Sequence, residues 1–533
     1  MKPFLIHYPL SMKEVYLFLI ISLVLCACTS GKRSNYSDEK QPNIVFLFAD
    51  DFGNNVPSVN GNKWVSTPHI DAIAKGGVRF RQNYVTAPIC CASRAGLLTG
   101  RYQQRFGSEN HLHYPYNSAY AGDGGLDYLK KLGIDSLDVK TQGIPESELN
   151  IAQILKQNGY TTGIIGKWHA GFYDGYRPHQ RGFDYSWGWY GGSSLYYTDS
   201  SDVNFVTFKD ENGLYHHYPS STGKYQWQRD PIATGIFRNG KLVDEKEYQT
   251  YAIAREAEAF LEKNKDNPFF LYVPFGAIHT PLQAVTKDYK QLDKIRDPQQ
   301  KVLLAMVLGL DEAVGRITQK LKELGLEENT IVVFSGDNGS TYHSLKPGEK
   351  GEGKTVYDGT YENLNLPFKG GKLTHYEGGI RTPLFIKWPG KIEPGSVYEH
   401  PVSTLDLLPT FVAATKTKLP ANRKYDGVDL WPFISGDNPE SPHPVLFWRN
   451  GFVKTIRKGD YKLLENDRDK TVFLYDLKKD PCEQTDLATQ LPAVVNELRH
   501  DFAQWEKELS PPRWKSPKVT EILVDGKLVS FQP

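Results

Sequence analysis

Three continuous apolar runs, each followed by polar residues, constrain the fold of this chain most strongly. They span residues 43–49, 268–275 and 330–335. A strand that is apolar on both faces is buried on both, which is typical of the central strands of a parallel sheet covered by helices. Segments with helical periodicity precede two of the runs, at 248–264 and 299–324. We therefore predict an α/β fold with a large mixed, mostly parallel sheet flanked by helices on both faces.

The runs place polar side chains at strand ends, where open α/β sheets bind their ligands. Asp50 and Asp51 follow the first run, and Asp337 and Asn338 follow the third. Adjacent carboxylates are costly unless a cation compensates their charge, and Ca²⁺ prefers several oxygen ligands. One interpretation is a metal site formed by these four residues. The other is a set of solvated turns, in which Asp, Asn and Gly are common.

A pair of cysteines stands where a strand-like run, 78–85, leads into a short apolar helix. Cys90 lies in the first turn of that helix, where free backbone N–H groups and the positive end of the dipole gather. This setting lowers the pKa of a thiol and attracts anions. Arg94, one turn later, adds a cation to the same place. The alternative is a buried structural pair, Cys90 and Cys91.

Other candidate functional residues also follow predicted strands. The run 160–165 continues into Lys167 and His169, which lie on the same side if the strand continues. His279 comes just after the run 268–275. The stretch from the aromatic run at 187 to about 238 shows no clear periodicity, and we predict an elaborated loop region near the site.

Composition changes near residue 442, where short strand-like runs with hairpin spacing begin. Residues 491–505 then carry apolar side chains on one face of a helix. We predict a small α+β subdomain with an antiparallel sheet and a closing helix. The net charge of +1 gives no basis for a nucleic-acid partner. Five cysteines are too few for a disulfide scaffold, and whether Cys91 and Cys482 pair stays open.

The first residues predict export. The apolar run 15–25 is too short to span a bilayer and fits a signal-peptide core. Residues 25–28 resemble a bacterial lipoprotein cleavage box, with Cys28 as the lipidated residue; an ordinary cleaved signal is the alternative. We expect a lipid-anchored protein of the periplasm or outer membrane, in contact with membrane only through that anchor. The predicted organisation is 1–28 signal peptide and lipobox, 29–41 tether, 42–440 catalytic domain and 441–533 C-terminal subdomain.

The segment 90–101, CCASRAGLLTGR, resembles the signature of the formylglycine-dependent (type I) sulfatases of the alkaline-phosphatase-like superfamily. In that family Pro or Ala stands two places after the modified Cys and Arg four places after, which fits Cys90 and not Cys91. Ala92 departs from the commoner Pro and resembles substrates of oxygen-independent radical maturases. Further segments that resemble the family, in order, are 166–171, 279–281, 369–383 and 474–481.

The resemblance implies a mechanism for sulfate-ester hydrolysis. Cys90 becomes formylglycine (3-oxoalanine), and the hydrated aldehyde attacks sulfur while Asp337 holds or accepts its proton. His279 protonates the departing sugar oxygen, and His169 takes a proton to release sulfate. The sulfate-binding cations are Arg94, Lys167 and Lys372. One Ca²⁺ per chain is held by Asp50, Asp51, residue 90, Asp337 and Asn338.

The same resemblance implies a bacterial glycan sulfatase that acts on sulfated carbohydrate and is activated by a sulfatase-maturing enzyme. Candidates for reading the sugar are His111, His113, Arg177, His179 and the insertion 341–361. Lone histidines such as the first two are more typical of a surface. Two alternatives are a phosphatase or phosphodiesterase of the same superfamily, with a Ser or Thr nucleophile and two zinc ions, and a catalytically dead glycan-binding lipoprotein.

Overall fold

A computed structural model shows the chain as two units, residues 1–41 and 42–533. The predicted signal peptide, the lipobox with Cys28 and nearly all of the tether lie outside the described residues, as does the insertion 341–361 apart from its first residue. Within the described part, no helix is long and apolar enough to cross a membrane. The domain boundaries stay a prediction. The described residues are 40–113, 139–197, 202–208, 234–341, 364–516, 519–524 and 527–532.

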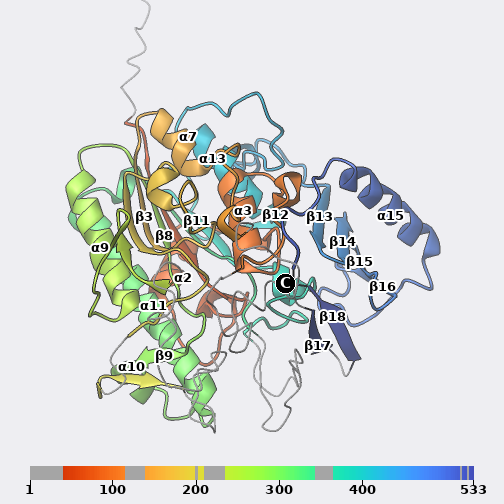
Figure 1. Ribbon diagram of the computed structural model, residues 1–533, viewed down its shortest axis with the longest axis horizontal. Coiled ribbons are helices and arrows are strands. Elements are labelled where there is room, and N and C mark those ends of the chain that lie inside the picture. Colours follow the sequence, from red (N-terminus) through yellow and green to blue (C-terminus); the bar gives the residue numbers. More distant parts are fainter. Residues whose placement is uncertain are drawn as a thin grey trace, which may run out of the picture. The chain divides into compact units, whose positions relative to one another are not determined.

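The second unit is built on a ten-stranded sheet in the order β12-β2-β11-β10-β1-β8-β3-β4-β6-β7; β3, β8, β11 and β12 of this sheet are labelled in Figure 1. The five central strands β10, β1, β8, β3 and β4 are parallel to one another. β11 runs antiparallel between β10 and β2, and β6 is antiparallel to β4. The predicted mixed, mostly parallel sheet is confirmed. Its strands are β1 (Asn43–Ala49), β2 (Val78–Tyr84), β3 (Thr161–Lys167), β4 (Tyr185–Trp189), β6 (Phe237–Arg238), β7 (Lys241–Leu242), β8 (Phe269–Pro274), β10 (Thr330–Gly336), β11 (Leu384–Lys387) and β12 (Ser396–Ser403).

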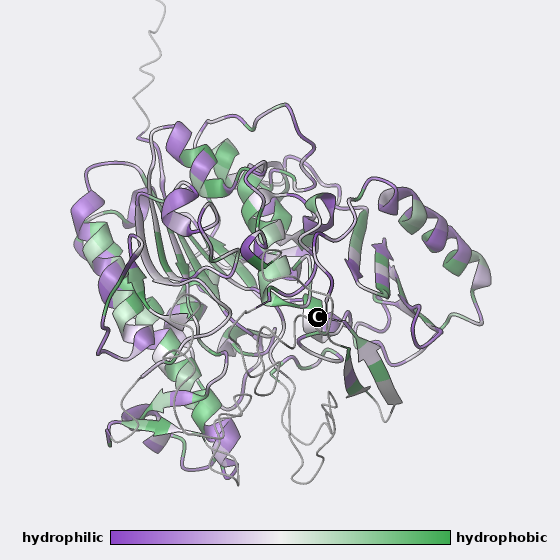
Figure 2. Cartoon of the chain, viewed as in Figure 1, coloured by the Kyte–Doolittle hydropathy of each residue, from purple (hydrophilic) through white to green (hydrophobic). Residues whose placement is uncertain are grey.

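Two hydrophobic layers cover the sheet because alternate residues of each central strand point to opposite faces. In β1, Val45 and Leu47 belong to one cluster, whereas Phe46 and Phe48 belong to the other. Figure 2 shows hydrophobic and hydrophilic residues alternating along α9 and α11, as expected for helices with one buried face. The first layer contains α2 (Pro68–Lys75), α9 (Gln249–Asn264) and α11 (Pro298–Glu323), and the second α3 (Cys90–Thr99), α7 (Ile151–Gln157) and α13 (Leu407–Ala414).

A second, antiparallel sheet lies in the C-terminal part, in the order β13-β14-β15-β16. One face carries Ile456, Leu463 and Leu474, which pack with α15 (Pro492–Glu506). This confirms the predicted sheet and closing helix. A further hairpin, β17 (Thr520–Val524) and β18 (Lys527–Phe531), was not predicted. The four strands are β13 (Val445–Asn450), β14 (Val453–Lys458), β15 (Tyr461–Asn466) and β16 (Thr471–Asp476).

The prediction of a loop region from residue 187 is wrong at its start, where β4 lies parallel to β3. Trp187 and Trp189 point into the first hydrophobic layer, and Gly188 between them faces the other way. A Cβ atom on Gly188 would lie 1.9 Å from the carbonyl oxygen of Gly166, so only glycine lets the two strands approach here. The Trp-Gly-Trp alternation is the period of a half-buried strand.

Candidate active site

The sheet brings the four predicted metal ligands together. β1 and β10 are parallel neighbours in register, so Asp50 and Asp51 lie beside Asp337 and Asn338 at the carboxyl ends of the strands. The Asp51 backbone N–H donates to Asp337 Oδ1 at 3.1 Å, and Asn338 Nδ2 donates to Asp51 Oδ1 at 2.8 Å. All four residues are buried. Oxygen donors nearly 300 residues apart in the chain thus converge.

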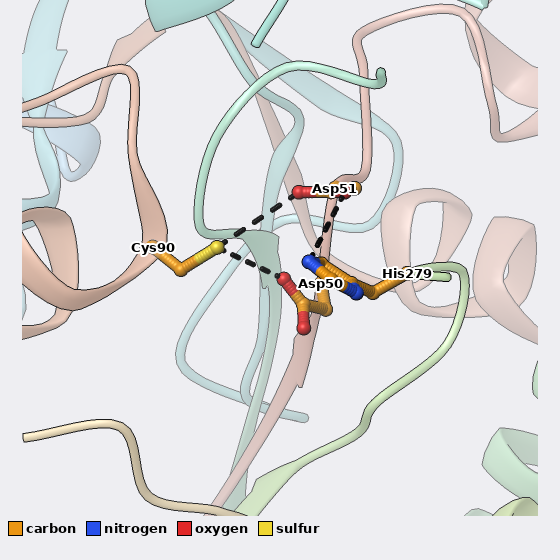
Figure 3. Close-up of side chains that lie close together, drawn as sticks. All are labelled: Asp50, Asp51, Cys90 and His279. Carbon is orange, nitrogen blue, oxygen red and sulfur yellow. Dashed lines mark hydrogen bonds and ion pairs between the residues drawn. The ribbon is translucent and has the colours of Figure 1, made fainter. Parts of the chain in front are cut away.

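Cys90 and His279 complete this cluster (Figure 3). Cys90 Sγ lies 3.4 Å from Asp50 Oδ1 and 3.9 Å from Asp51 Oδ1. His279 Nε2 is 3.9 Å from Asp51 Oδ2, on the loop that follows β8. Asp50, Asp51, Cys90 and His279 each offer one ligand atom, and these atoms all lie within 4.8 Å of one another, a spacing that could hold a metal ion. His279 is therefore a possible ligand that the sequence analysis did not include in the metal set.

The expected lowering of the cysteine pKa is wrong. Cys90 is the first residue of α3, as predicted, but burial and the neighbouring Asp50 carboxylate raise the pKa of its thiol well above the usual value. Burial also raises the pKa of Cys91 to about 11. Desolvation of the thiolate outweighs the helix dipole at both positions. Cys91 faces the Asn110 carbonyl oxygen, and neither it nor Cys482 forms a disulfide within the described ranges.

Three cations pair with the three carboxylates. Arg94 donates from Nε and Nη2 to Asp337 Oδ2 at 2.9 and 2.7 Å. Lys167 Nζ lies 2.5 Å from Asp50 Oδ2, and Lys372 Nζ lies 2.7 Å from Asp51 Oδ1. The first two pairs are fully buried and the third nearly so. Because buried charges are stable only when compensated, six residues form one electrostatic unit: Asp50, Asp51, Asp337, Arg94, Lys167 and Lys372.

The pKa shifts follow from this crowding. Burial raises the pKa of Asp51, but the charges of Lys372 and His279 outweigh it and hold the pKa well below its usual range. Burial and Asp50 raise the pKa of Asp337 to about 6. Burial and Lys372 lower the pKa of His279 to about 3, so its imidazole is neutral near pH 7 in this environment.

The residues present fit a metal ion. Asn338 Oδ1 is buried and has no hydrogen-bond partner within the described part of the chain, while its Nδ2 is satisfied by Asp51 and the Gly339 carbonyl oxygen. Buried polar atoms are rarely left in this condition. The oxygen-only donor set of Asp50, Asp51, Asp337 and Asn338 suits a hard divalent cation, which takes several oxygen ligands.

The remaining predicted site residues fall into two groups. His169 is buried, and its backbone N–H donates to the Tyr190 carbonyl oxygen at 3.0 Å. Its imidazole ring contacts that of His111 edge to face, with 5.5 Å between the ring centroids. His113 is buried and contacts Gln142 at 2.8 Å, so the expectation that it lies at the surface is wrong.

Arg177 and His179 make no described contact with the electrostatic unit of three carboxylates and three cations. Arg177 Nε donates to the Phe172 carbonyl oxygen, and its Nη1 pairs with Asp174. Thr341, predicted only as the first residue of the sugar-reading insertion 341–361, donates its hydroxyl to Asp51 Oδ2 at 2.8 Å. Sequence reasoning did not assign it to the carboxylates, since Thr is unremarkable in a turn.

Comparisons with known proteins agree with this geometry. The family profile described as Sulfatase matches residues 42–417, and the profile described as N-sulphoglucosamine sulphohydrolase, C-terminal, matches residues 371–508. Steryl-sulfatase of Homo sapiens is 29% identical over 464 residues, which cover 78% of this chain and 74% of the relative. N-acetylgalactosamine-6-sulfatase of Mus musculus is 31% identical over 433 residues, covering 79% and 71%.

Solved structures share the fold. Ps i-CgsB, in complex with k-i-k-neocarrahexaose, is 31% identical with a TM-score of 0.73, over 89% of this chain and 95% of that chain. The family profile covers well over half of the sequence, and these relatives are hydrolases of sulfuric esters. The chain therefore belongs to the sulfatase family and is a sulfuric ester hydrolase.

Proposed function

We propose that this sulfatase removes O-sulfate groups from glycans, with formylglycine made from Cys90 and one bound Ca²⁺. The observation that carries the proposal is the buried cluster in which Cys90 Sγ faces Asp50 and Asp51. Three cations pair with these two carboxylates and with the adjacent Asp337. A sulfate ester is an anion, and positive charge around its oxygens is what its hydrolysis requires.

Two groups would complete the site. Ca²⁺ would be held by Asp50, Asp51, Asp337 and Asn338, which fit it as described above, and when bound it supplies positive charge beside residue 90. Formylglycine supplies an oxygen nucleophile that a thiol cannot. Residue 90 is placed to present this oxygen to the proposed metal site, because its side chain points at Asp50 and Asp51 (Figure 3).

Binding of the sulfate group falls to the cations of the chain. Arg94 is fixed by Asp337 and by the Lys167 carbonyl oxygen, to which its Nη1 donates at 3.0 Å. Lys167 and Lys372 carry flexible ammonium groups that can reorient from carboxylate to sulfate oxygens. A fixed guanidinium and two adjustable ammonium groups orient the ester and exclude water from its oxygens.

Proton movement falls to the histidines. His279 Nδ1 lies 2.6 Å from the Thr280 carbonyl oxygen, so Nδ1 carries the proton in the neutral ring and Nε2, toward Asp51, is the exchanging atom. A substrate anion beside this ring favours its protonated form, and Nε2 can then deliver a proton to the departing sugar oxygen. His169, two residues after the end of β3, would accept the proton when sulfate leaves.

The glycan substrate is inferred from the relatives. Ps i-CgsB was solved with a neocarrahexaose, and the mouse relative is named for N-acetylgalactosamine 6-sulfate, so sugar esters recur among the most similar proteins. Among the described sugar-reading candidates, His111 contacts His169. We further propose activation by a sulfatase-maturing enzyme and a lipid anchor at Cys28 on the periplasmic or outer membrane of a bacterium.

The proposal is tested at Cys90. Peptide mass spectrometry across residues 87–94 of protein made with a maturase should show an aldehyde at position 90. The same preparation should release sulfate from a panel of sulfated mono- and oligosaccharides of defined regiochemistry. Cys90→Ala should fold with an unchanged circular dichroism spectrum and release none.

The matched control is Cys91→Ala, which removes the adjacent buried thiol and should retain turnover. An unmodified thiol in fully active enzyme, or wild-type rates from Cys90→Ala, would refute the mechanism. Activity confined to phosphate esters would favour the phosphatase alternative.

A further inference from the structure

The segment 369–383, which carries Lys372, is tied by its backbone to the candidate metal site. The Lys372 N–H donates to the Ser340 carbonyl oxygen at 3.2 Å, and the Gly339 N–H donates to the Gly379 carbonyl oxygen at 3.0 Å. The turn that follows β10 and holds the Asn338 side chain therefore depends on this segment for its position.

The segment packs tightly against the turn that follows β10. A Cβ atom on Gly339 would lie 1.8 Å from the Gly378 carbonyl oxygen, so the two backbones are in direct contact. On its other side the segment contacts the loop that leads into α3 and Cys90. The Leu373 N–H donates to the carbonyl oxygen of Pro88, two residues before Cys90, at 2.9 Å. A small displacement of the segment would be felt at both places.

A buried ionic cluster joins the segment to the C-terminal sheet. Lys462, the second residue of β15, contacts Glu377 Oε1 at 3.0 Å and Glu483 Oε1 at 2.9 Å, and all three side chains have no solvent exposure. Glu483 Oε2 also accepts from the Glu377 N–H at 2.7 Å. A fully buried lysine is costly unless it is paired, so an apolar residue would serve a purely packing role better.

One row on the other face of the sheet is directed at the segment. Arg457, Lys462 and Tyr475 are cross-strand neighbours in this row. Arg457 donates to the Tyr84 hydroxyl, which in turn donates to Glu377 Oε2 at 2.7 Å. The face that packs on α15 also carries ion pairs, such as that of Lys458, but these are partly exposed, whereas Lys462 and its partners are fully buried.

We propose that Lys462 and Glu483 are positioning residues for the sulfate and metal sites. They fix segment 369–383 so that Lys372 reaches Asp51 and the turn after β10 presents Asn338. The inference rests on the proposed function for the roles of Lys372 and Asn338, and it assigns part of the active site to the C-terminal sheet, which contributes no side chain to the described cluster.

The test is Lys462→Met, which keeps the length of the side chain and removes its charge. Isothermal titration of the mature enzyme with Ca²⁺, and then with inorganic sulfate in Ca²⁺, should give dissociation constants about tenfold higher than in wild type, the usual effect of losing an outer-shell partner. The matched control is Lys458→Met on β14, whose ammonium pairs with Glu497 and Asp501 of α15, away from the segment. It should bind as wild type does.

A purely structural role predicts a lower unfolding midpoint with unchanged dissociation constants in folded Lys462→Met, and that result would overturn the proposal. If Lys462→Met does not fold, Glu483→Gln decides instead, because glutamine can still accept from the Glu377 N–H while the charge is lost. Wild-type binding by Glu483→Gln would equally count against us. Wild-type enzyme that binds Ca²⁺ but hydrolyses no sulfate ester would refute the proposed function, while the comparison of variants would still decide the positioning role.

Discussion

At the scale of single residues, Asp51 is the most heavily used group in the site. Its carboxylate accepts from Lys372, Asn338 and Thr341, and its backbone N–H donates to Asp337. A carboxylate with this many donors stays ionised. If Lys372 is lost, Asn338 and Thr341 still donate to Asp51. Lys372 is thus better placed for work on an anion than for stability.

We expect Lys372→Ala to lower kcat/KM for a sulfate ester about 100-fold, or about 2.7 kcal/mol, because one donor to the developing charge is lost. In Ca²⁺ the free energy of unfolding should fall by less, since Asn338 and Thr341 still bind Asp51. Steady-state kinetics and urea unfolding measure the two quantities. Lys387→Ala, which breaks the ion pair with Glu327, is the control and should keep full activity. A stability loss larger than the activity loss would show that Lys372 is structural.

At the scale of elements, one carboxylate connects the large sheet to the C-terminal part. Asp406, at the end of the short 3-10 turn η7 (Thr404–Asp406) that leads into α13, accepts from the Ser403 and Val428 N–H groups at 2.8 and 2.9 Å. His443 Nε2, just before β13, contacts the same carboxylate at 2.7 Å. This contact therefore holds the residues just before β13 against η7.

The pair should make stability depend on pH. Burial lowers the pKa of His443, but Asp406 and, more weakly, Asp426 outweigh it and raise the pKa above the usual value. A raised histidine pKa stabilises the fold fully below the unfolded value of about 6.5 and loses this contribution as pH rises through the folded value. The urea midpoint of His443→Gln should therefore lie below that of wild type at about pH 6, and the gap should narrow toward about pH 9. A gap that widens with pH would exclude a charged pair.

At the scale of the whole molecule, the sequence predicts most of the sheet but not its edges. Central strands such as β1 and β10 are uninterrupted apolar runs, so local pattern alone identifies them. β12 was missed because it is an edge strand that contains Pro401 and exposed charged residues. The convergence of Asp50, Asp51, Asp337 and Asn338 at strand ends was predictable from topology. The pairing of Arg94 with Asp337 was not, since these residues are 243 positions apart and nothing local links them.

Metal removal should act on the whole fold. The proposed ligand set exists only when β1 and β10 are paired, so Ca²⁺ would bind the folded chain and not the unfolded one. At 100 times the dissociation constant, such a ligand adds about 2.7 kcal/mol to the free energy of unfolding. Calorimetry of enzyme stripped with a chelator should show a lower midpoint that Ca²⁺ restores. Asn338→Leu should blunt this response, and an identical midpoint with and without Ca²⁺ in wild type would contradict a metal site.

The contact between the Gly339 and Gly378 backbones has a consequence for anyone who wishes to recombine sulfatases. The stretch from 369 to β11 lies against the C-terminal sheet at one end and inside the large sheet at the other. The two family profiles overlap from 371 to 417, in the same part of the chain. The C-terminal sheet is therefore not an independent module. In a chimera joined after β12, the C-terminal sheet of one protein would face segment 369–383 of another, and Lys372 would be displaced.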